Sequence, residues 1–200
     1  MEVGEPLQAR HWIFDLDGTL TRAVHDFDGI RTSLGLPQGK PILESLDQLP
    51  KEEAAPKRQW LDAMELELAQ ASTPQAGIVE HLQALHAAGT RLGILTRNSK
   101  RNALASIEAL GVAALFDEAH VLGRDEAAFK PDPAGLHHLL AAWDARPEDA
   151  LFAGDGRFDL EAGRRAGIRT LYFDPSGAFP HSALADMCLS CWTQQPFVQA

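Results

Sequence analysis

The chain has 200 residues and a formal net charge of −10 at pH 7, with 45% apolar and 23% charged residues. This length suits one ordinary domain with room for a small appended one, and the composition is close to the globular average, which excludes extensive disorder. The acidic balance argues against non-specific nucleic-acid binders and proteins that dock on anionic membranes, because both need a basic face.

The sequence indicates a cytoplasmic protein. No stretch approaches the ~18 consecutive apolar residues that a membrane-spanning helix requires. The segment Met1 to Arg10 is acidic and polar, without the apolar run that follows a basic start in secretion signals. Cys188 and Cys191 are too few for a disulfide framework and fit a reducing compartment.

Short apolar runs alternate along the chain with segments of helical periodicity. Apolar residues at helical spacing predict one helix opened by Pro74, one closed by Gly111 and one behind Asp132–Pro133. This alternation predicts an α/β fold, a doubly wound, mainly parallel, Rossmann-like sheet with helices on both faces. The strands are expected at 11–16, 91–96, 118–122, 150–154 and 169–173.

The region from Thr21 to about Ser72 breaks this alternation, because it contains no convincing strand. Four prolines between positions 37 and 56 divide its first part into short pieces. A charged helix with an apolar seam then follows, and we expect a small helical cap inserted after the first strand. The apolar seam of this helix is formed by Trp60, Leu61, Met64 and Leu68. The predicted division is a core of residues 1–20 and 73–200 and a cap of residues 21–72.

The strongest motif, Asp15–Leu16–Asp17–Gly18–Thr19–Leu20, ends the first predicted strand. Residues two apart in an extended strand point to the same side, so Asp15 and Asp17 can face one site. Two carboxylates this close ionise together at low cost only when a cation joins them, and hard oxygen ligands point to Mg²⁺. Gly18 allows a sharp turn and leaves its N–H accessible to a ligand. The alternative is a solvated turn, where Asp and Gly are also common.

Two further segments carry charged side chains. Asp155 ends the predicted strand at 150–154, and Asp159 follows in the first turn of the next helix, where a simple helix-start role is the alternative. Lys130 precedes Pro-Asp-Pro, an extended or turn geometry that can aim its ammonium at an anion. The alternative for Lys130 is an ordinary loop lysine.

Thr96, Arg97 and Asn98 follow the second strand and resemble an anion-binding helix start, with a simple helix cap as the alternative. Asp15, Asp17, Thr96, Lys130 and Asp155 all lie at or just beyond the carboxyl ends of strands, or in the loop that leads to the next helix. That edge of an open α/β sheet is where ligands bind, so their convergence predicts one functional site.

These motifs resemble the haloacid dehalogenase superfamily. The order Asp-x-Asp-Gly-Thr-Leu, strand-end Thr, Lys-Pro and Gly-Asp-x-x-x-Asp is most similar to its phosphoglycolate-phosphatase-like members with a small helical cap. The resemblance covers about residues 10 to 175. The second aspartate of the first motif, which the dehalogenases themselves lack, favours phosphoryl transfer.

The resemblance implies a role for each of these side chains. Asp15 would be the nucleophile that forms an aspartyl-phosphate, and Asp17 the general acid and then the base. Thr96 and Lys130 would hold the phosphoryl oxygens. A magnesium ion would be held by Asp15, by Asp17 through its backbone carbonyl, by Asp155, and by Asp159 directly or through water. The expected substrate-binding residues are Gly18, Arg97 and Asn98.

This sequence departs from the family pattern in three places. Thr21–Arg22 stands where many relatives have an Asp-Ser pair, and Gly156 and Phe158 occupy positions that are often polar in relatives. The cap, about 50 residues long, is short for the group. A smaller cap covers the site with fewer side chains, so the substrate preference of relatives does not transfer.

We therefore predict a Mg²⁺-dependent phosphatase that hydrolyses small-metabolite phosphate monoesters. The alternatives are a phosphomutase of the same family that acts on a sugar phosphate, and a non-catalytic phosphate- and metal-binding module. The expected partner is a small phosphate ester, without nucleic acid or membrane, and the expected assembly is a monomer or homodimer.

Several other features have ordinary interpretations. Cys188-x-x-Cys191 has zinc-like spacing, but zinc needs about four ligands and the sequence has no second pair. Arg22 and Arg31, near the start of the cap, could contact a substrate carboxylate or a second anion, although surface arginines are commoner. Arg97 and Arg124 are similarly ambiguous.

Overall fold

The computed structural model describes residues 9–22, 26–194 and 197–198. Within these residues, seven strands form one sheet in the order β3-β2-β1-β4-β5-β6-β7. The strands β1 to β6 are parallel to their neighbours, and β7 is antiparallel to β6. The predicted α/β fold with a mainly parallel sheet is confirmed. The strands are β1 (His11–Phe14), β2 (Arg91–Leu95), β3 (Val121–Leu122), β4 (Ala150–Gly154), β5 (Arg169–Phe173), β6 (Met187–Leu189) and β7 (Phe197–Val198).

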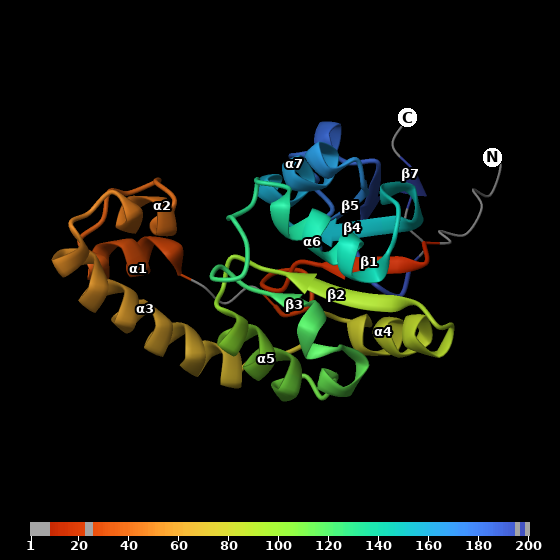
Figure 1. The fold of residues 1–200 in the computed structure, drawn as a ribbon, viewed down its shortest axis with the longest axis horizontal. Helices are drawn as coiled ribbons and strands as arrows, with labels where there is room; N and C mark the ends of the chain where they lie inside the picture. The colour runs from red at the N-terminus through yellow and green to blue at the C-terminus, as the bar shows by residue number, and fades with distance from the viewer. Residues whose placement is uncertain (1–8, 23–25, 195–196, 199–200) are drawn as a thin grey trace.

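Helices cover both faces of the sheet (Figure 1). The helices α4 (Ile78–Ala87) and α5 (Lys100–Ala109) lie on one face, and α6 (Ala134–Trp143) and α7 (Arg157–Ala166) on the other. Four short 3₁₀ turns join elements of the described chain. They are η1 (Ala113–Leu115), η2 (Glu118–His120), η3 (Pro147–Asp149) and η4 (Ser182–Leu184).

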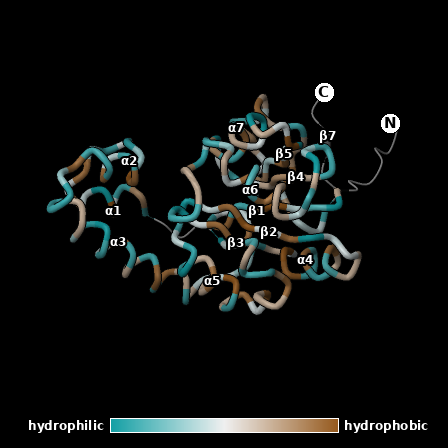
Figure 2. Tube along the Cα trace, viewed as in Figure 1, coloured by the Kyte–Doolittle hydropathy of each residue, from teal (hydrophilic) through white to brown (hydrophobic). Residues whose placement is uncertain are grey.

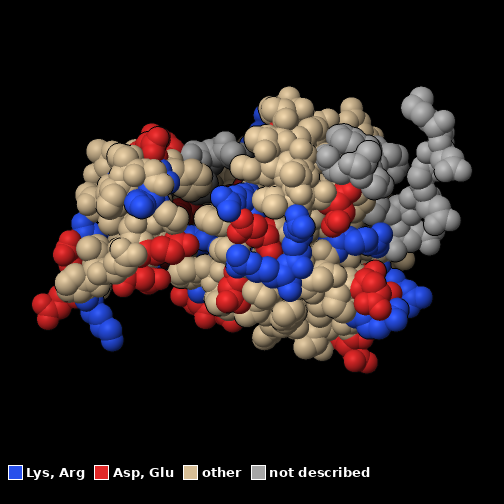
Figure 3. All heavy atoms as spheres, turned by 90° about the horizontal axis from the view of Figure 1, so that it is seen from above, with Lys and Arg blue, Asp and Glu red and all other residues tan. Residues whose placement is uncertain are grey.

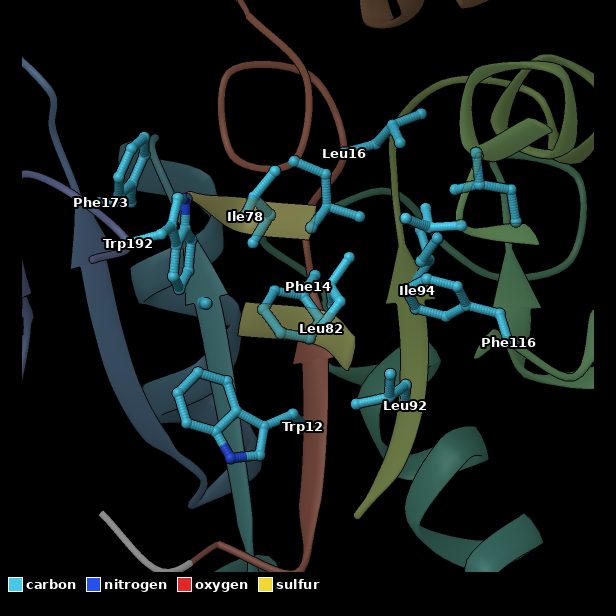
Figure 4. Packing of buried hydrophobic residues seen from close by; sticks show 14 of the residues in the cluster. Trp12, Phe14, Leu16, Ile78, Leu82, Leu92, Ile94, Phe116, Phe173 and Trp192 are labelled. Carbon is cyan, nitrogen blue, oxygen red and sulfur yellow. The ribbon is translucent and has the colours of Figure 1, made fainter. Parts of the chain in front are cut away.

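The central strands are apolar along their whole length because helices cover them on both sides. Every residue of β1 and β4 is buried. Figure 4 shows Phe14 of β1 packed with Ile78 and Leu82 of α4 and with Ile94 of β2. In Figure 2 the hydrophobic residues, coloured brown, are concentrated along these strands and on the helices beside them. This packing fixes the carboxyl ends of β1, β2 and β4 at one edge of the sheet.

Between β1 and α4 the chain forms a helical insert of α1 (Phe27–Leu34), α2 (Ile42–Asp47) and α3 (Lys51–Gln70). These helices share a small apolar cluster that includes Ile30, Leu43 and Leu61. The long helix α3 runs from this cluster to the sheet part, where it lies beside α5 (Figure 1). The insert after the first strand is therefore confirmed, while its division from the core at residues 20/21 and 72/73 stays a prediction.

Some element boundaries differ from the sequence-based expectation. Residues 118–120 form a 3₁₀ turn instead of a strand, because the Asp117 side chain accepts a hydrogen bond from Ala119 N at 2.9 Å and caps the turn. The helix expected from Pro74 begins at Ile78, since Pro74 makes a bridge with Thr21. Trp60 is 43% exposed and does not belong to the apolar seam of α3, because it lies about 100° around the helix from the buried Leu61.

The carboxyl-terminal part of the chain continues the sheet, which the sequence-based interpretation missed. Cys188 lies in β6 and is buried, so it is part of the sheet, and both cysteines are free thiols. The polar segment Met1–Arg10 lies outside the described residues except for its last two positions. None of the helices described here is both long and apolar enough to cross a membrane. On the face shown in Figure 3, acidic and basic side chains lie next to one another.

Candidate active site

Asp15 occupies the centre of the edge formed by the strand ends. It follows β1 directly, its backbone N–H donates to Ala153 O at 2.8 Å, and only 6% of the residue is exposed. The backbone hydrogen bonding between β1 and β4 thus continues to Asp15, and this fixes the position of the Asp15 backbone. Burial raises the pKa of Asp15 to about 7, against the opposing effect of Lys130.

Lys130 is buried between two of the predicted site residues. Its Nζ donates to Asp15 Oδ1 and lies 2.6 Å from Asp159 Oδ1. Burial disfavours the ammonium, but Asp15 and Asp159 together raise the pKa of Lys130 above its ordinary value. The lysine therefore stays charged and joins the end of β1 to the first turn of α7.

Asp159 also holds the loop before α7. Its Oδ2 accepts a hydrogen bond from Gly156 N at 2.9 Å, so the side chain caps the helix that carries it. Asp159 therefore caps the start of α7, which is the alternative role that the sequence suggested. It also forms the ion pair with Lys130. The same carboxylate therefore has a structural role and a place in the site.

Asp15, Asp155 and Asp159 form a cluster suited to a divalent cation. Carboxylate oxygens from these three residues lie within 4.8 Å of one another. Burial, together with Asp15 and Asp159, raises the pKa of Asp155 to about 8. Three acids beside the single cation of Lys130 are costly to ionise, and a hard cation with oxygen ligands relieves that cost. The donor set therefore fits a metal such as Mg²⁺ or Ca²⁺.

Glycine permits the close approach of the acids. Gly18 has φ +94°, and a Cβ at this position would lie 2.0 Å from Asp155 Oδ2. A Cβ at Gly154 would lie 2.3 Å from Asp159 Cβ. The Gly18 N–H donates to Thr21 O at 3.0 Å, so the expectation that this N–H is open to a ligand is wrong. Gly18 instead makes room for the Asp155 carboxylate.

The segment after β2 positions a second set of polar groups. Thr96 is buried, and its Oγ1 accepts a hydrogen bond from Asn98 N at 3.0 Å. Asn98 Nδ2 donates to Asp17 Oδ2 at 3.3 Å. The structure thus brings Asp17, Thr96 and Asn98 to the edge that holds Asp15. Among the described residues, the Asp17 side chain is not part of the three-carboxylate cluster.

Arg97 points toward the helical insert. Its Nη2 lies 2.6 Å from Glu44 Oε2 on α2, and its Nη1 donates to Lys130 O at 2.6 Å. The Cζ lies 4.9 Å from the centre of the Phe158 ring. The guanidinium thus joins the insert to the loop that carries Lys130. A contact of Arg97 with the substrate stays a prediction.

A cleft of about 490 Å³ opens between the insert and these strand ends. Its floor consists of predicted site residues, and its other wall comes from α1, α2 and α3. Gly18 and Arg22 are not among the residues that line it. The predicted residues that do line it are Asp15, Asp17, Thr96, Arg97, Asn98, Lys130, Asp155 and Asp159.

This arrangement and the sequence agree with one protein family. A match to the family described as haloacid dehalogenase-like hydrolase covers residues 28–173, well over half of the chain. The chain belongs to this family. The resemblance seen in its motifs is confirmed.

Two relatives and one solved structure are similar to this chain. A phosphoglycolate phosphatase of Rhodospirillum rubrum is 32% identical over 192 residues, which cover 78% of this chain and 76% of the relative. An N-acetylmuramic acid 6-phosphate phosphatase of Pseudomonas aeruginosa is 30% identical over 180 residues, covering 79% and 78%. The crystal structure of CbbY from Rhodobacter sphaeroides shares the fold, with a TM-score of 0.73 over 93% of this chain and 96% of that one at 21% identity.

The predicted enzyme class is confirmed at the level of the family: the chain is a phosphatase among the haloacid dehalogenase-like hydrolases. The individual roles assigned to its residues stay predictions. The structure gives these predictions a geometric basis, because it brings the residues of all four motifs to one cleft.

Sequence reasoning missed several side chains that line this cleft. Glu65 of α3 is one of them, and burial raises its pKa to about 7 against the effect of Arg124. Phe27 of α1 is another, and Phe158 stood out only as a departure from relatives. Arg31 lines the cleft as suspected, but its Nη1 is 2.8 Å from Asp28 Oδ1. Residues on the insert have no local motif, so nothing in the sequence showed which of them face the core.

Proposed function

We propose that this phosphatase hydrolyses phosphate monoesters of small metabolites through an aspartyl-phosphate on Asp15, with Mg²⁺ as its metal. The observation that carries the proposal is the cluster of Asp15, Asp155 and Asp159, with the buried Lys130 in contact with Asp15 and Asp159. A strand-end carboxylate with a fixed lysine beside it can act as a nucleophile and still tolerate an incoming anionic phosphate.

Asp15 would perform the first step. A carboxylate oxygen attacks phosphorus, the bond from phosphorus to the ester oxygen breaks, and the leaving oxygen takes a proton from Asp17. Asn98 Nδ2, 3.3 Å from Asp17 Oδ2, would hold the Asp17 side chain in place. Lys130 would offset charge between Asp15 and the phosphoryl oxygens, and Thr96 would donate to one of those oxygens.

The second step would return the enzyme to its starting state. Asp17, now ionised, takes a proton from a water molecule, whose oxygen attacks phosphorus. The bond between phosphorus and the Asp15 oxygen breaks, which releases inorganic phosphate and restores the Asp15 carboxylate. The carboxylates of Asp15, Asp155 and Asp159 would hold Mg²⁺, which would supply the positive charge that lets an anionic nucleophile meet an anionic substrate.

The substrate class rests on the cleft and on the names of the relatives. The two relatives are named for phosphoglycolate and for N-acetylmuramic acid 6-phosphate, which are both phosphate monoesters of small molecules. The cleft volume of about 490 Å³ is in the range of small-molecule sites.

The test is phosphate release from a panel of small esters, with and without Mg²⁺, by the native chain and by Asp15→Asn. We expect Mg²⁺-dependent release that the substitution abolishes, while Asp125→Asn, at an exposed position, retains it. Release by Asp15→Asn at the native rate would overturn the mechanism. Isomerisation of a sugar phosphate with little release would indicate a phosphomutase, and no release even from an aryl phosphate would overturn the hydrolase.

A further inference from the structure

Two of the exposed large apolar side chains of the described chain line the cleft. Among the described residues, the exposed large apolar side chains are Phe27 (53%), Trp60 (43%) and Phe158 (36%). Phe27 of α1 and Phe158 of α7 line the cleft, one from the insert and one from the sheet part, whereas Trp60 lies outside it. Exposed aromatic surface that gathers at a concave site marks a place where a ligand covers it.

The wall next to Phe27 continues this apolar surface. Ile30, Ile42, Leu43 and Leu61, all of the insert, also line the cleft. Leu61 and Ile30 belong to the buried cluster of the insert, so their positions are fixed by packing. The part of the cleft away from the three carboxylates is therefore a preformed apolar wall, which suits an apolar group on the substrate.

The arginines that line the cleft are already paired with acids. Arg31 Nη1 is 2.8 Å from Asp28 Oδ1, and Arg97 Nη2 is 2.6 Å from Glu44 Oε2. The third, Arg157, has its Nε 2.5 Å from Glu161 Oε1.

The remaining cation of the lining, Lys130, is held between Asp15 and Asp159. A carboxylate or second phosphate on the leaving group would thus compete with acids that already pair with these cations. Among the described residues, the charge pattern favours a leaving group without a charge of its own.

We propose that the cleft takes phosphate monoesters of neutral alcohols that carry an aromatic ring, with the ring against Phe27 and Phe158. This inference rests on the proposed phosphatase function and specifies its substrate class. The phosphate lies at the strand ends near Asp15 and Lys130, and the ring extends toward the insert. Contact of the ring with these two phenylalanines would bury apolar surface on both walls of the cleft. Edge-to-face or offset-stacked packing of the aromatic rings would add to the binding free energy.

The test compares ethyl phosphate, 2-phenylethyl phosphate and phosphoglycolate. The first two release simple alkanols of similar acidity, so a difference between them reports binding of the ring and not leaving-group chemistry. We expect kcat/KM for 2-phenylethyl phosphate to exceed that for ethyl phosphate by about tenfold or more, the size of effect that apolar pockets produce. Phosphoglycolate should be no better than ethyl phosphate.

Three variants locate the effect. Phe27→Ala and Phe158→Ala should each lower the ratio of kcat/KM for 2-phenylethyl phosphate to kcat/KM for ethyl phosphate by about tenfold. Trp60→Ala is the matched control, because it removes an exposed aromatic side chain of the same chain outside the cleft, and it should leave the ratio as in the native chain. Phe158 also lies over Arg97, so Phe27→Ala tests the proposal independently of that contact.

The outcomes separate this inference from the proposed function. Asp15-dependent release from all three esters with equal kcat/KM, or a preference for phosphoglycolate, would overturn the aromatic substrate class and leave the phosphatase intact. A ratio that falls equally in Trp60→Ala and in the two phenylalanine variants would also overturn it. No release from any of the three esters, nor from an aryl phosphate, would overturn both.

Discussion

Arg124, in the loop after β3, forms an ion pair with Glu65 of the helical insert, with 2.9 Å between Arg124 Nη1 and Glu65 Oε2. The guanidinium also contacts Asp62, one turn earlier on α3. Only 6% of the Arg124 side chain and 13% of the Glu65 side chain are exposed. Together with Arg97–Glu44, this ion pair joins the sheet part to the insert at two places, and Glu65 and Arg97 line the cleft.

Arg124→Met should therefore loosen the insert. Removing one partner leaves Glu65 buried without its cation, and a broken buried pair costs about 3–5 kcal/mol in other proteins. We expect faster amide hydrogen exchange in α2 and in the first half of α3, and a kcat/KM lowered by about tenfold or more because the cleft is no longer held together.

The control for this prediction is Arg58→Met. Arg58 pairs with Asp47 within the insert, and 35% of the Arg58 side chain and 53% of the Asp47 side chain are exposed, so this pair contributes little. Exchange and kcat/KM should stay near native values. Equal changes in the two variants would show that Arg124 has no special role between the two parts.

The sequence predicted the floor of the cleft because its residues lie at strand ends or in the segments that lead from a strand to the next helix. The strand ends are marked locally by apolar runs and glycine, and parallel strands bring their carboxyl ends to one edge regardless of sequence distance. That reasoning placed Asp15, Thr96, Lys130 and Asp155 at one site, and the structure brings them together.

The opposite wall had no such local signal. Glu65 and Arg124 look like solvated charges in the sequence, and only the length and direction of α3 place them face to face. Phe27 likewise begins an ordinary amphipathic helix, whose orientation depends on how α1 packs within the insert. The strand β6, Met187–Leu189, was missed because three residues are too few to show a period.

Mg²⁺ binding should depend strongly on pH. Burial raises the pKa of Asp15 to about 7 and that of Asp155 to about 8, against an ordinary value of 3.8. The metal binds the ionised carboxylates, so binding must displace protons below these pKa values. Apparent affinity should rise with pH up to about 8, by about tenfold per pH unit for each proton displaced. Calorimetry in buffers of different ionisation enthalpy measures the proton release directly.

The same pKa shifts predict the stability of the metal-free protein. Between pH 4 and pH 8 the folded state holds protons that the unfolded state has already released, so the free energy of unfolding falls as pH rises through this window. Mg²⁺ should restore stability most at the alkaline end. Urea unfolding with EDTA or with Mg²⁺ at several pH values checks this, and a metal-free protein that becomes more stable from pH 5 to pH 8 would contradict it.

Lys130→Met should affect both activity and stability. The ammonium contacts Asp15 and Asp159, and without it two buried acids face each other. We expect turnover to fall by about a hundredfold to a thousandfold, as for loss of a preorganised donor at a reaction centre. The metal-free protein should lose about 3–5 kcal/mol at pH 8 and less at pH 6, where Asp15 is protonated.

Lys51→Met, at the exposed first residue of α3, provides the comparison for Lys130→Met. Its turnover and its urea midpoint should match the native chain at both pH values. A Lys130→Met protein with the same stability loss at pH 6 and pH 8 would show that lost packing, and not the uncompensated acids, causes the effect.

Gly18→Ala should separate backbone strain from damage to the metal site. The residue has φ +94°, and its new Cβ would lie 2.0 Å from Asp155 Oδ2, so the carboxylate has to move away from Asp15 and Asp159. Gly89→Ala is the matched control, because Gly89 has φ +79° and open space where the Cβ would be. Both substitutions should cost about 1–2 kcal/mol of stability from the left-handed backbone. Gly18→Ala alone should also weaken Mg²⁺ binding by about tenfold or more, since displaced ligands lose affinity on this scale. Equal Mg²⁺ affinity in the two variants would show that Asp155 does not hold the metal.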